Sequence, residues 1–386
     1  MIAIVIFSNC NAFLSGAAFS SPTMLNAFTK IINPDYLLTG IEILSSGFLI
    51  VILVIYATLN LKKTRFFFKQ RIQSELEVWV AKAILDESED GRSFNIPASF
   101  FRILKRPLAK EFTVEELINT KKNLTGTAAN NIIALYEELD LKKVSLKKLR
   151  NSKWHIRARG IHELYSMQQM DTLPLIYENT NNQYEFVRME AQIGVINMTG
   201  FEGLRFLDQV SYPITEWQQI KLLDQLRSAE ESGQLATHLP KWLSSLNDTV
   251  IIFALKLAAE YQQFSVHDAV AKCLAHNNVS VRLQAIKTLV HITNETTPQI
   301  LTEHYPNEKF TNQLALLDAL VKIATLDQAW FLIGLLDDPS DIIKLKAGRI
   351  LAHSFPRGLE ALEERGRAPS GPYQDIYLHI KSEMER

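Results

Sequence analysis

The clearest hydrophobic pattern in the chain is an uncharged apolar run, Ile43–Leu61. As an α-helix, these 19 residues would be about 28 Å long at about 1.5 Å per residue, close to the ~30 Å hydrocarbon core of a bilayer. The run is longer and more uniformly apolar than a typical core helix of a soluble protein, which is the competing interpretation. We therefore predict one transmembrane helix over residues 37–61.

The basic residues that flank this run lie almost entirely on its C-terminal side. Within the twenty residues before it, the only basic residue is Lys30. Five basic residues follow within ten positions: Lys62, Lys63, Arg65, Lys69 and Arg71. Because the cytoplasmic flanks of membrane helices are enriched in Lys and Arg, this bias predicts a single-pass protein of the cytoplasmic (inner) membrane with its C-terminal domain in the cytoplasm.

Residues 1–36 precede the predicted span, and residues 1–29 carry no charged side chain. A secretory signal normally has a basic N-terminal region, which is missing here. Three interpretations stay open: a weak signal peptide, a second short membrane-active segment, or a translation start at Met24, which we favour. We assign the segment as an extracytoplasmic or signal-like N-terminus.

Residues 62–153 are expected to form a basic, helical juxtamembrane region with a possible capping repeat. An apolar residue recurs at every fourth position of its first part, which is typical of one face of a helix: Phe68, Ile72, Leu76, Val80 and Ile84. The acidic stretch 86–91 resembles the first half of a calcium-binding loop. The twelfth position of such a loop requires a bidentate Glu and is Pro97 here, so we expect a solvated acidic loop instead.

An internal repeat occupies residues 154–364. Seven copies of a helical pattern follow one another at intervals of about 31 residues, within the range typical of repeat architectures. Each copy ends on an apolar residue: Leu164, Val195, Leu226, Ala258, Leu289, Leu320 and Leu351. Within each copy the apolar positions follow a helical period. In five copies a small residue lies four positions earlier, where it would let a neighbouring backbone come close: Gly160, Ala191, Ala254, Ala285 and Ala347.

Four copies share a basic residue seven positions before the final apolar residue: Arg157, Arg188, Arg282 and Lys344. This row could bind anions, but we favour pairing with carboxylates or carbonyls between units. The other three copies have Gln219, Ile251 and Gln313 at this position. A second apolar helix lies between copies, so each unit is expected to be a helix pair that buries its faces only by stacking on its neighbours.

The pattern Val-Arg-x-x-Ala-x-x-x-Leu at about 31 residues resembles bacterial HEAT repeats. The resemblance implies an all-α fold: a right-handed α-solenoid of about seven HEAT-like helix pairs over residues 154–364, closed by a C-terminal capping helix over residues 365–386. HEAT-like arrays commonly act as scaffolds, while some resemble phycobilin lyases or alkylpurine glycosylases. The resemblance is therefore specific for the fold and uninformative about activity.

The charge of the chain is balanced in total but unevenly distributed. The 386 residues carry 41 basic and 42 acidic side chains, a net charge of −1. Residues 1–153 hold 20 basic and 14 acidic side chains, and residues 154–386 hold 21 basic and 28 acidic. The acidic distal part would repel phosphate, so we expect no nucleic-acid partner. The basic proximal part suits anionic lipid, which leaves a lipid-docking sensor as an alternative function.

Signatures of catalysis and of cofactor binding are missing from the sequence. It has no phosphate-binding loop, no dinucleotide-binding glycine motif, no zinc-protease motif and no Cys-x-x-Cys pair. Two cysteines, Cys10 and Cys273, cannot build a disulfide framework or a thiolate zinc site. We therefore expect no catalytic residue, cofactor, metal or enzymatic activity. The alternative is an enzyme of the HEAT-like lyase or glycosylase type, for which Glu303 and His304 are candidate groups.

Two tryptophans near helix starts or proline-containing turns, Trp217 and Trp242, are candidate partner anchors, because aromatic residues dominate interface hot spots. Packing between repeats is the competing interpretation. The repeat, the anchor and the lack of catalytic motifs favour a membrane-anchored cytoplasmic scaffold or adaptor that binds a protein partner. A regulatory subunit of a membrane enzyme is one form this role could take.

Overall fold

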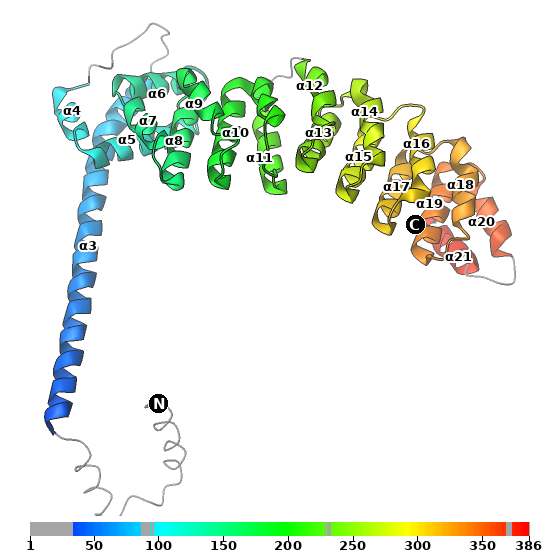
Figure 1. Ribbon diagram of the computed structural model, residues 1–386, viewed down its shortest axis with the longest axis horizontal. Helices are drawn as coiled ribbons and strands as arrows, with labels where there is room; N and C mark the ends of the chain where they lie inside the picture. Colours follow the sequence, from blue (N-terminus) through cyan, green and yellow to red (C-terminus); the bar gives the residue numbers. More distant parts are fainter. Residues whose placement is uncertain are drawn as a thin grey trace, which may run out of the picture. The chain divides into compact units, whose positions relative to one another are not determined.

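The computed structural model describes residues 34–85, 94, 96–227, 229, 233–367 and 373–385. Helices are the only regular elements within these residues. The chain divides into two compact units, residues 1–79 and residues 80–386, and the helix α3 (Pro34–Leu85) crosses the division (Figure 1). The expectations for the N-terminus up to residue 33 and for the acidic stretch 86–91 fall outside the described residues.

Helix α3 is one uninterrupted helix of 52 residues that contains both the apolar run and the apolar stripe behind it. The large apolar side chains between Leu38 and Leu61 are 51–68% exposed, so the described part of the chain does not cover them. Farther along, Ile72 and Leu76 are buried, while Ile84 is exposed. The helix continues past residue 62 without a break, as the spacing of the apolar stripe predicts.

The second unit begins with four helices that precede the repeat: α4 (Ala98–Leu104), α5 (Pro107–Lys121), α6 (Gly126–Glu138) and α7 (Lys142–Leu149). The helices that carry the repeat copies, which we call the repeat helices, are α8 (Trp154–Ser166), α10 (Glu185–Thr199), α11 (Glu216–Leu226), α13 (Asp248–Glu260), α15 (Val279–His291), α17 (Phe310–Ile323) and α19 (Asp341–Ser354). Shorter helices alternate with them: α9 (Leu173–Tyr177), the 3-10 helix η3 (Gly200–Asp208), α12 (Gln234–Trp242), α14 (His267–Lys272), α16 (Thr297–His304), α18 (Ala329–Leu335) and α20 (Gly358–Gly366). The last helix is α21 (Tyr373–Met384).

Burial of the repeat positions agrees with the register predicted from the sequence. The final apolar residues of all seven copies, from Leu164 to Leu351, are 0–2% exposed. One hydrophobic core runs through the stack from Leu149 to Ile380. Successive helices of this unit lie side by side in chain order (Figure 1), as expected for a helical-repeat stack. The hand of the stack and its assignment as HEAT repeats stay predictions.

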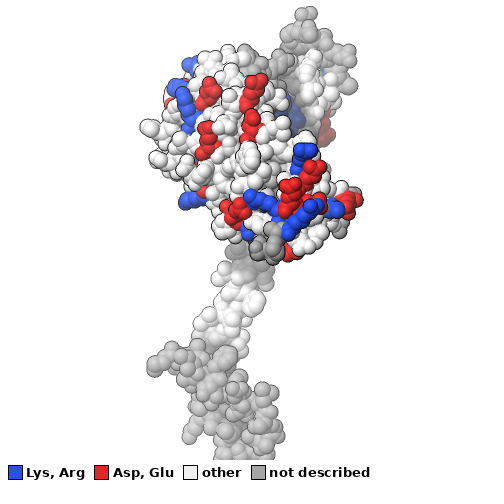
Figure 2. Space-filling view, turned by 90° about the vertical axis from the view of Figure 1, so that its right-hand side faces the viewer, with Lys and Arg blue, Asp and Glu red and all other residues white. Residues whose placement is uncertain are grey.

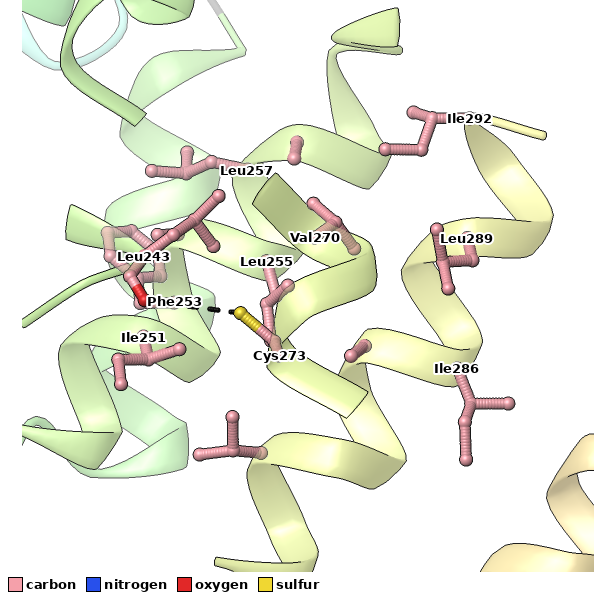
Figure 3. Close-up of a cluster of buried hydrophobic side chains, with 14 of the residues drawn as sticks. Leu243, Ile251, Phe253, Leu255, Leu257, Val270, Cys273, Ile286, Leu289 and Ile292 are labelled. Atoms are coloured by element: carbon pink, nitrogen blue, oxygen red, sulfur yellow. Dashed lines mark hydrogen bonds between the residues drawn. The ribbon is translucent and has the colours of Figure 1, made fainter. Parts of the chain in front are cut away.

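Cys273 lies in the part of this core that Figure 3 shows, where side chains from α13, from the segment around α14 and from α15 meet. Its Sγ atom donates to the carbonyls of Ala269 (3.5 Å) and Leu243 (4.0 Å). Burial raises the pKa of the Cys273 thiol to about 11, because the low-polarity surroundings disfavour the thiolate. Cys273 is therefore a neutral packing residue at physiological pH.

Gly160 shows what the small residue of the repeat does. A Cβ at this glycine would lie 2.3 Å from the backbone nitrogen of Leu149 and 2.8 Å from the carbonyl oxygen of Ser145, both on α7. Atoms that are not bonded pack at about 3.5–4.0 Å. The packing of α8 on α7 therefore requires glycine in the first copy, whereas Ala191 and Ala285 fill the same position in later copies.

The end of the second unit that carries α21 is charged with both signs, as Figure 2 shows. Ile380 of α21 is fully buried against α19 and α20. Around it, the Nε atom of Arg349 on α19 donates to Glu383 (2.8 Å), and Arg365 of α20 donates to Asp337 (3.0 Å). The predicted capping segment 365–386 thus contains the end of α20 and the helix α21, with residues 368–372 outside the described part.

Candidate interaction surface

The repeat helices form a continuous face of the second unit. Neighbouring repeat helices pack against one another in chain order from α8 to α11 and from α13 to α19, and the Thr288 hydroxyl of α15 donates to the Leu255 carbonyl of α13 (2.9 Å). Between α11 and α13, Gln219 Nε2 donates to the Thr249 carbonyl (3.4 Å). Each of these helices buries the side that carries its final apolar residue and leaves the opposite side half-buried or exposed. We call the surface built from these exposed sides the repeat-helix face.

The arginines at the basic position of the repeat are engaged with the turns before their own helices. Arg188 is only 7% exposed. Its guanidinium donates to the carbonyls of Asn182 (2.8 Å) and Gln183 (3.0 Å) and lies 4.3 Å from the centroid of the Tyr212 ring. Arg188 therefore has little capacity left for an external anion.

Arg282 and Lys344 are engaged in similar ways. Arg282 donates to the buried Glu308 carboxylate (2.6 Å) and to the carbonyl of His276 (2.8 Å). Lys344 donates to Asp341 (2.9 Å), and in the first copy Arg157 donates to the Asn151 carbonyl (3.0 Å). These contacts agree with pairing to carboxylates and carbonyls, and give no support to a row that binds anions.

Aromatic side chains gather at the N-terminal ends of the first three repeat helices. Trp217 of α11 is 60% exposed, Phe186 of α10 is 56% exposed and Trp154 of α8 is 41% exposed. The rings of Trp154 and Phe186 stack with their centroids 5.4 Å apart and an interplanar angle of 22°. One turn after Trp217, the Lys221 ammonium lies 4.9 Å from the centroid of the Trp217 ring. We call Trp154, Phe186 and Trp217 the aromatic patch.

Trp242, the other predicted partner anchor, has a different role. It is only 2% exposed, and its indole N–H donates to the Asp208 carboxylate (2.7 Å). Lys241 also pairs with Asp208 (2.6 Å). Although partial burial acts to raise the pKa of Asp208, the hydrogen bonds from Lys241 and Trp242 outweigh it and lower that pKa. The prediction for Trp242 is therefore corrected: the side chain packs between repeats and is not accessible to a partner.

Sequence reasoning missed two members of the aromatic patch. Phe186 occupies the same position in its copy of the repeat as Trp217 does in the next copy, and His155 occupies that position in the first copy. The repeat register could have predicted that Phe186 is exposed, because this position lies on the exposed side of each helix. Stacking of Trp154 on Phe186 had no such signal, since it depends on how α8 packs against α10. Trp330 of α18, which is 82% exposed, lies outside the patch.

The charged side chains that line a cavity outside this face already have partners. The cavity, of about 410 Å³, lies beside η3 and is lined by Tyr177, Glu202, Arg205 and Asp208 among others. Arg205 donates to Glu202 (2.8 Å), and Asp208 accepts from Lys241 and Trp242. The described residues contain no group of three or more His, Cys, Asp or Glu side chains placed to hold a metal ion.

Glu303 and His304, the candidate groups for an enzyme, lie next to each other at the C-terminal end of α16. Glu303 is exposed and accepts a hydrogen bond from Gln299 one turn earlier (2.7 Å). The geometry thus gives these two residues an ordinary surface environment.

The basic residues that were predicted to set membrane topology all lie on α3, directly after its exposed apolar part. Four of them are exposed and Lys69 is half-buried: Lys62, Lys63, Arg65, Lys69 and Arg71. The Lys63 ammonium lies 5.9 Å from the Phe67 ring centroid, and Arg71 approaches Glu75 at 3.9 Å. The structure contains one helix that is long and apolar enough to cross a membrane among the described residues.

Comparisons with known proteins give no family for this chain. No family model matches it, and no curated protein matches it. Similar solved structures include an engineered protein (14% identity over 82% of this chain and 91% of that chain, TM-score 0.33) and Kap121p (11% identity over 81% of this chain, TM-score 0.36). The chain covers 37% of the Kap121p chain. Human deoxyhypusine hydroxylase matches at 13% identity over 66% of this chain and 96% of that chain, with a TM-score of 0.24. With TM-scores this low, none of these likenesses carries an argument about function.

Proposed function

We propose that this protein is a membrane-anchored helical-repeat scaffold, which binds a protein partner through the aromatic patch on its repeat-helix face. The anchor is the apolar part of α3, and its orientation places the second unit in the cytoplasm. The role is one of binding rather than catalysis, and a regulatory subunit of a membrane enzyme is one form of it.

The aromatic patch is the observation that carries the binding role. A fully buried aromatic side chain removes about 150–250 Å² of surface from water. At the observed exposures of 41–60%, the three rings still offer about 200–400 Å². A stable interface buries about 800 Å² on each partner, so the patch can supply the centre of an interface but not all of it. Exposed clusters of this kind commonly mark interaction sites.

Membrane attachment is supported by the exposure of α3 itself. A core helix of a soluble protein would be covered by its own chain, whereas the large apolar side chains between Leu38 and Leu61 are more than half exposed. Leaving such a surface in water costs about 25 cal/mol per Å² of apolar area, which a lipid core relieves. The basic residues after Leu61 favour the cytoplasm for the second unit.

The first test is affinity purification of the full chain from native membranes in mild detergent, followed by mass spectrometry. We expect a stoichiometric protein partner with the wild-type chain. The double variant Phe186→Ala with Trp217→Ala should lose most of it, because both rings would be removed from the centre of the interface. Trp330→Ala is the matched control, since it removes a more exposed aromatic ring elsewhere and should retain the partner.

Two outcomes contradict the binding role. One is a chain that purifies alone with and without crosslinking. The other is a partner retained equally by the Phe186→Ala, Trp217→Ala variant and by the control.

The topology has its own test, which is protease protection in intact and permeabilised cells or vesicles. The second unit should be cleaved only when the cytoplasmic face is accessible. Extraction of the whole chain by alkaline carbonate, without detergent, would contradict a membrane-spanning α3.

A further inference from the structure

We propose that the aromatic patch binds a proline-rich segment of the partner, held in the polyproline II conformation. This inference rests on the proposed function, because it takes the partner to be a protein. It adds the chemistry and the conformation of the segment that enters the patch.

Two exposed tyrosines extend the aromatic patch in the turns before α10 and α11. Tyr184 is the residue directly before α10 and is 42% exposed. Tyr212 lies in the turn before α11 and is 39% exposed. Each tyrosine is thus at the same end of its helix as the Phe186 or Trp217 ring. Exposed aromatic rings therefore occupy the N-terminal ends of three successive repeat helices, α8, α10 and α11.

Contacts between neighbouring helices divide these rings into two groups. Trp154 of α8 and Phe186 of α10 stack on each other, which places one group where α8 and α10 meet. Tyr212 reaches Arg188 of α10 from the turn before α11, and Trp217 follows on α11, which places the second group where α10 and α11 meet. Because α10 packs against both α8 and α11, the groups are about one helix spacing apart, or about 8–10 Å.

Contacts within the chain hold several of the rings in place before a partner binds. Stacking restrains Trp154 and Phe186, and the Lys221 ammonium lies over the Trp217 ring. The Tyr212 ring lies on Arg188, which is buried and bonded to two carbonyls. Ordering this surface on binding should therefore cost little free energy.

A polyproline II helix repeats at the spacing of the two groups. It has three residues per turn and rises about 3.1 Å per residue, so the same side recurs about every 9 Å. A segment laid across the ends of α8, α10 and α11 would therefore present one side to both groups, with two apolar positions three residues apart. A β-strand matches less well, because every second side chain faces the surface and the repeat is about 7 Å.

The polar ends of the rings supply hydrogen-bond donors. Within the described part of the chain, no hydrogen bond is made by the indole N–H of Trp154 or Trp217 or by the hydroxyl of Tyr184 or Tyr212. An indole N–H can only donate, so a matching segment must offer acceptors. A polyproline II helix offers its carbonyls, which make no internal hydrogen bonds, and its prolines have no N–H that needs an acceptor in return.

Other modes of peptide recognition fit these observations less well. Addition of a strand needs an exposed sheet edge, and the part of the chain that the structure describes contains no strand. A partner helix bonds its carbonyls internally along most of its length, so it would leave the donors of the patch unused. Proline-rich segments are the ones that characteristically dock on surfaces lined with aromatic rings.

The area of the rings also suits a short segment. At exposures of 39–60%, the patch and the two tyrosines offer about 350–600 Å². A folded partner domain, or a second copy of this chain, would need about 800 Å² on each side. The rings can therefore accommodate a short segment by themselves, and a larger partner would add contacts around it.

The test is fluorescence anisotropy with the full chain in mild detergent and labelled, uncharged twelve-residue peptides. The probe peptide carries Pro at every third position. One comparison peptide has Ala in place of each Pro, which favours a helix, and another has Gly, which keeps the carbonyls but loses the preset conformation. We expect the proline peptide to bind at least about tenfold more tightly than either. Because no charges pair, salt should change its affinity by less than about twofold.

The matched variants separate the rings from their polar ends. Tyr184→Phe with Tyr212→Phe keeps both rings and removes two hydroxyls, which should weaken the proline peptide about fivefold or more. Trp217→Ala removes a whole ring and should weaken it about tenfold or more. Trp330→Ala, outside the patch, should change the affinity by less than about twofold. All four side chains are exposed, so the fold should be unchanged, which circular dichroism checks.

Equal affinities for the proline, alanine and glycine peptides overturn the inference. So do equal effects of Trp217→Ala and Trp330→Ala, and so does a double tyrosine variant that binds the proline peptide as the wild type does. These failures are distinct from failure of the proposed function. A partner that co-purifies and needs Phe186 and Trp217, but is not released by excess proline peptide, leaves the scaffold role standing and removes only the proline-rich segment.

Discussion

A buried ion pair at the start of the repeat gives the sharpest test of how the stack is held together. Glu163 of α8 and Lys148 of α7 join at 2.6 Å, with side chains 3% and 10% exposed. The same carboxylate accepts hydrogen bonds from the Ser145 hydroxyl (2.8 Å) and from Arg159 Nε (3.1 Å). The Ser145 hydroxyl in turn accepts from the hydroxyl of Tyr136 on α6 (2.9 Å). The Glu163 carboxylate thus connects α8 to α7 directly and to α6 through the Ser145 and Tyr136 hydroxyls.

Removing only the carboxylate should be much worse than removing both charges. The variant Glu163→Leu leaves the Lys148 ammonium buried without its counter-charge, and breaking such pairs costs about 3–5 kcal/mol. The double variant with Lys148→Met removes both charges and keeps the volume roughly filled, which should cost less than about 2 kcal/mol. Adding Lys148→Met should therefore restore at least about 1–3 kcal/mol of the stability that Glu163→Leu removes.

Hydrogen exchange is the suitable assay, because a repeat stack can open locally at one end. Amides of α7 and α8 should exchange about a hundredfold faster or more in Glu163→Leu, and most of that protection should return in the double variant. Amides of α13 and α15 serve as an internal control and should be unchanged. Equal exchange in the single and double variants would refute the reasoning, since it would mean that the charge of Lys148 is not buried in solution.

Three further predictions concern single side chains of the core. Gly160→Ala should lower the free energy of unfolding by about 1–3 kcal/mol, seen as a lower urea midpoint, because its Cβ would collide with the Leu149 backbone despite the better helix propensity of alanine; an unchanged midpoint would contradict this packing. Trp242→Phe should cost about 2 kcal/mol through loss of the hydrogen bond to Asp208 and of core volume, and a cost near zero would argue against its buried position. Cys273 should resist alkylation at pH 8 in the folded protein and react at once in urea, as peptide mass spectrometry would show. Because the pKa of the Cys273 thiol is raised from 9.0 to about 11, the stability that the neutral thiol contributes is complete below pH 9 and is lost as the pH rises toward 11. Rapid labelling of the folded chain at pH 8 would be inconsistent with burial of this thiol.

The interior of the stack followed from the sequence because helical geometry is local. Apolar residues at the period of an α-helix must share one side of it, and each copy of the repeat presents that side again. The buried final positions, such as Leu226 and Leu289, are the direct result. The uninterrupted α3 is a similar case, since a long run without proline or charge leaves a helix as the favoured structure.

The composition of the candidate interaction surface depended on tertiary structure. Trp217 and Trp242 look alike in sequence, and only the packing of α12 against η3 and α13 determines that Trp242 is buried while Trp217 faces water. Likewise, Trp154 and Phe186 belong to successive copies of the repeat and meet only because α8 packs on α10. The partners of Arg188 and Arg282 come from turns whose carbonyl directions no periodicity encodes.

The sequence by itself thus determined which side of each helix is buried, where the helices repeat and which segment is apolar enough to enter a membrane. These properties arise from residues within a few turns of one another. Tertiary structure alone decided which exposed residues lie together, including the stacked rings of Trp154 and Phe186. That choice depends on contacts between helices far apart in the chain, because adjacent exposed side chains on neighbouring helices need no shared pattern along the sequence.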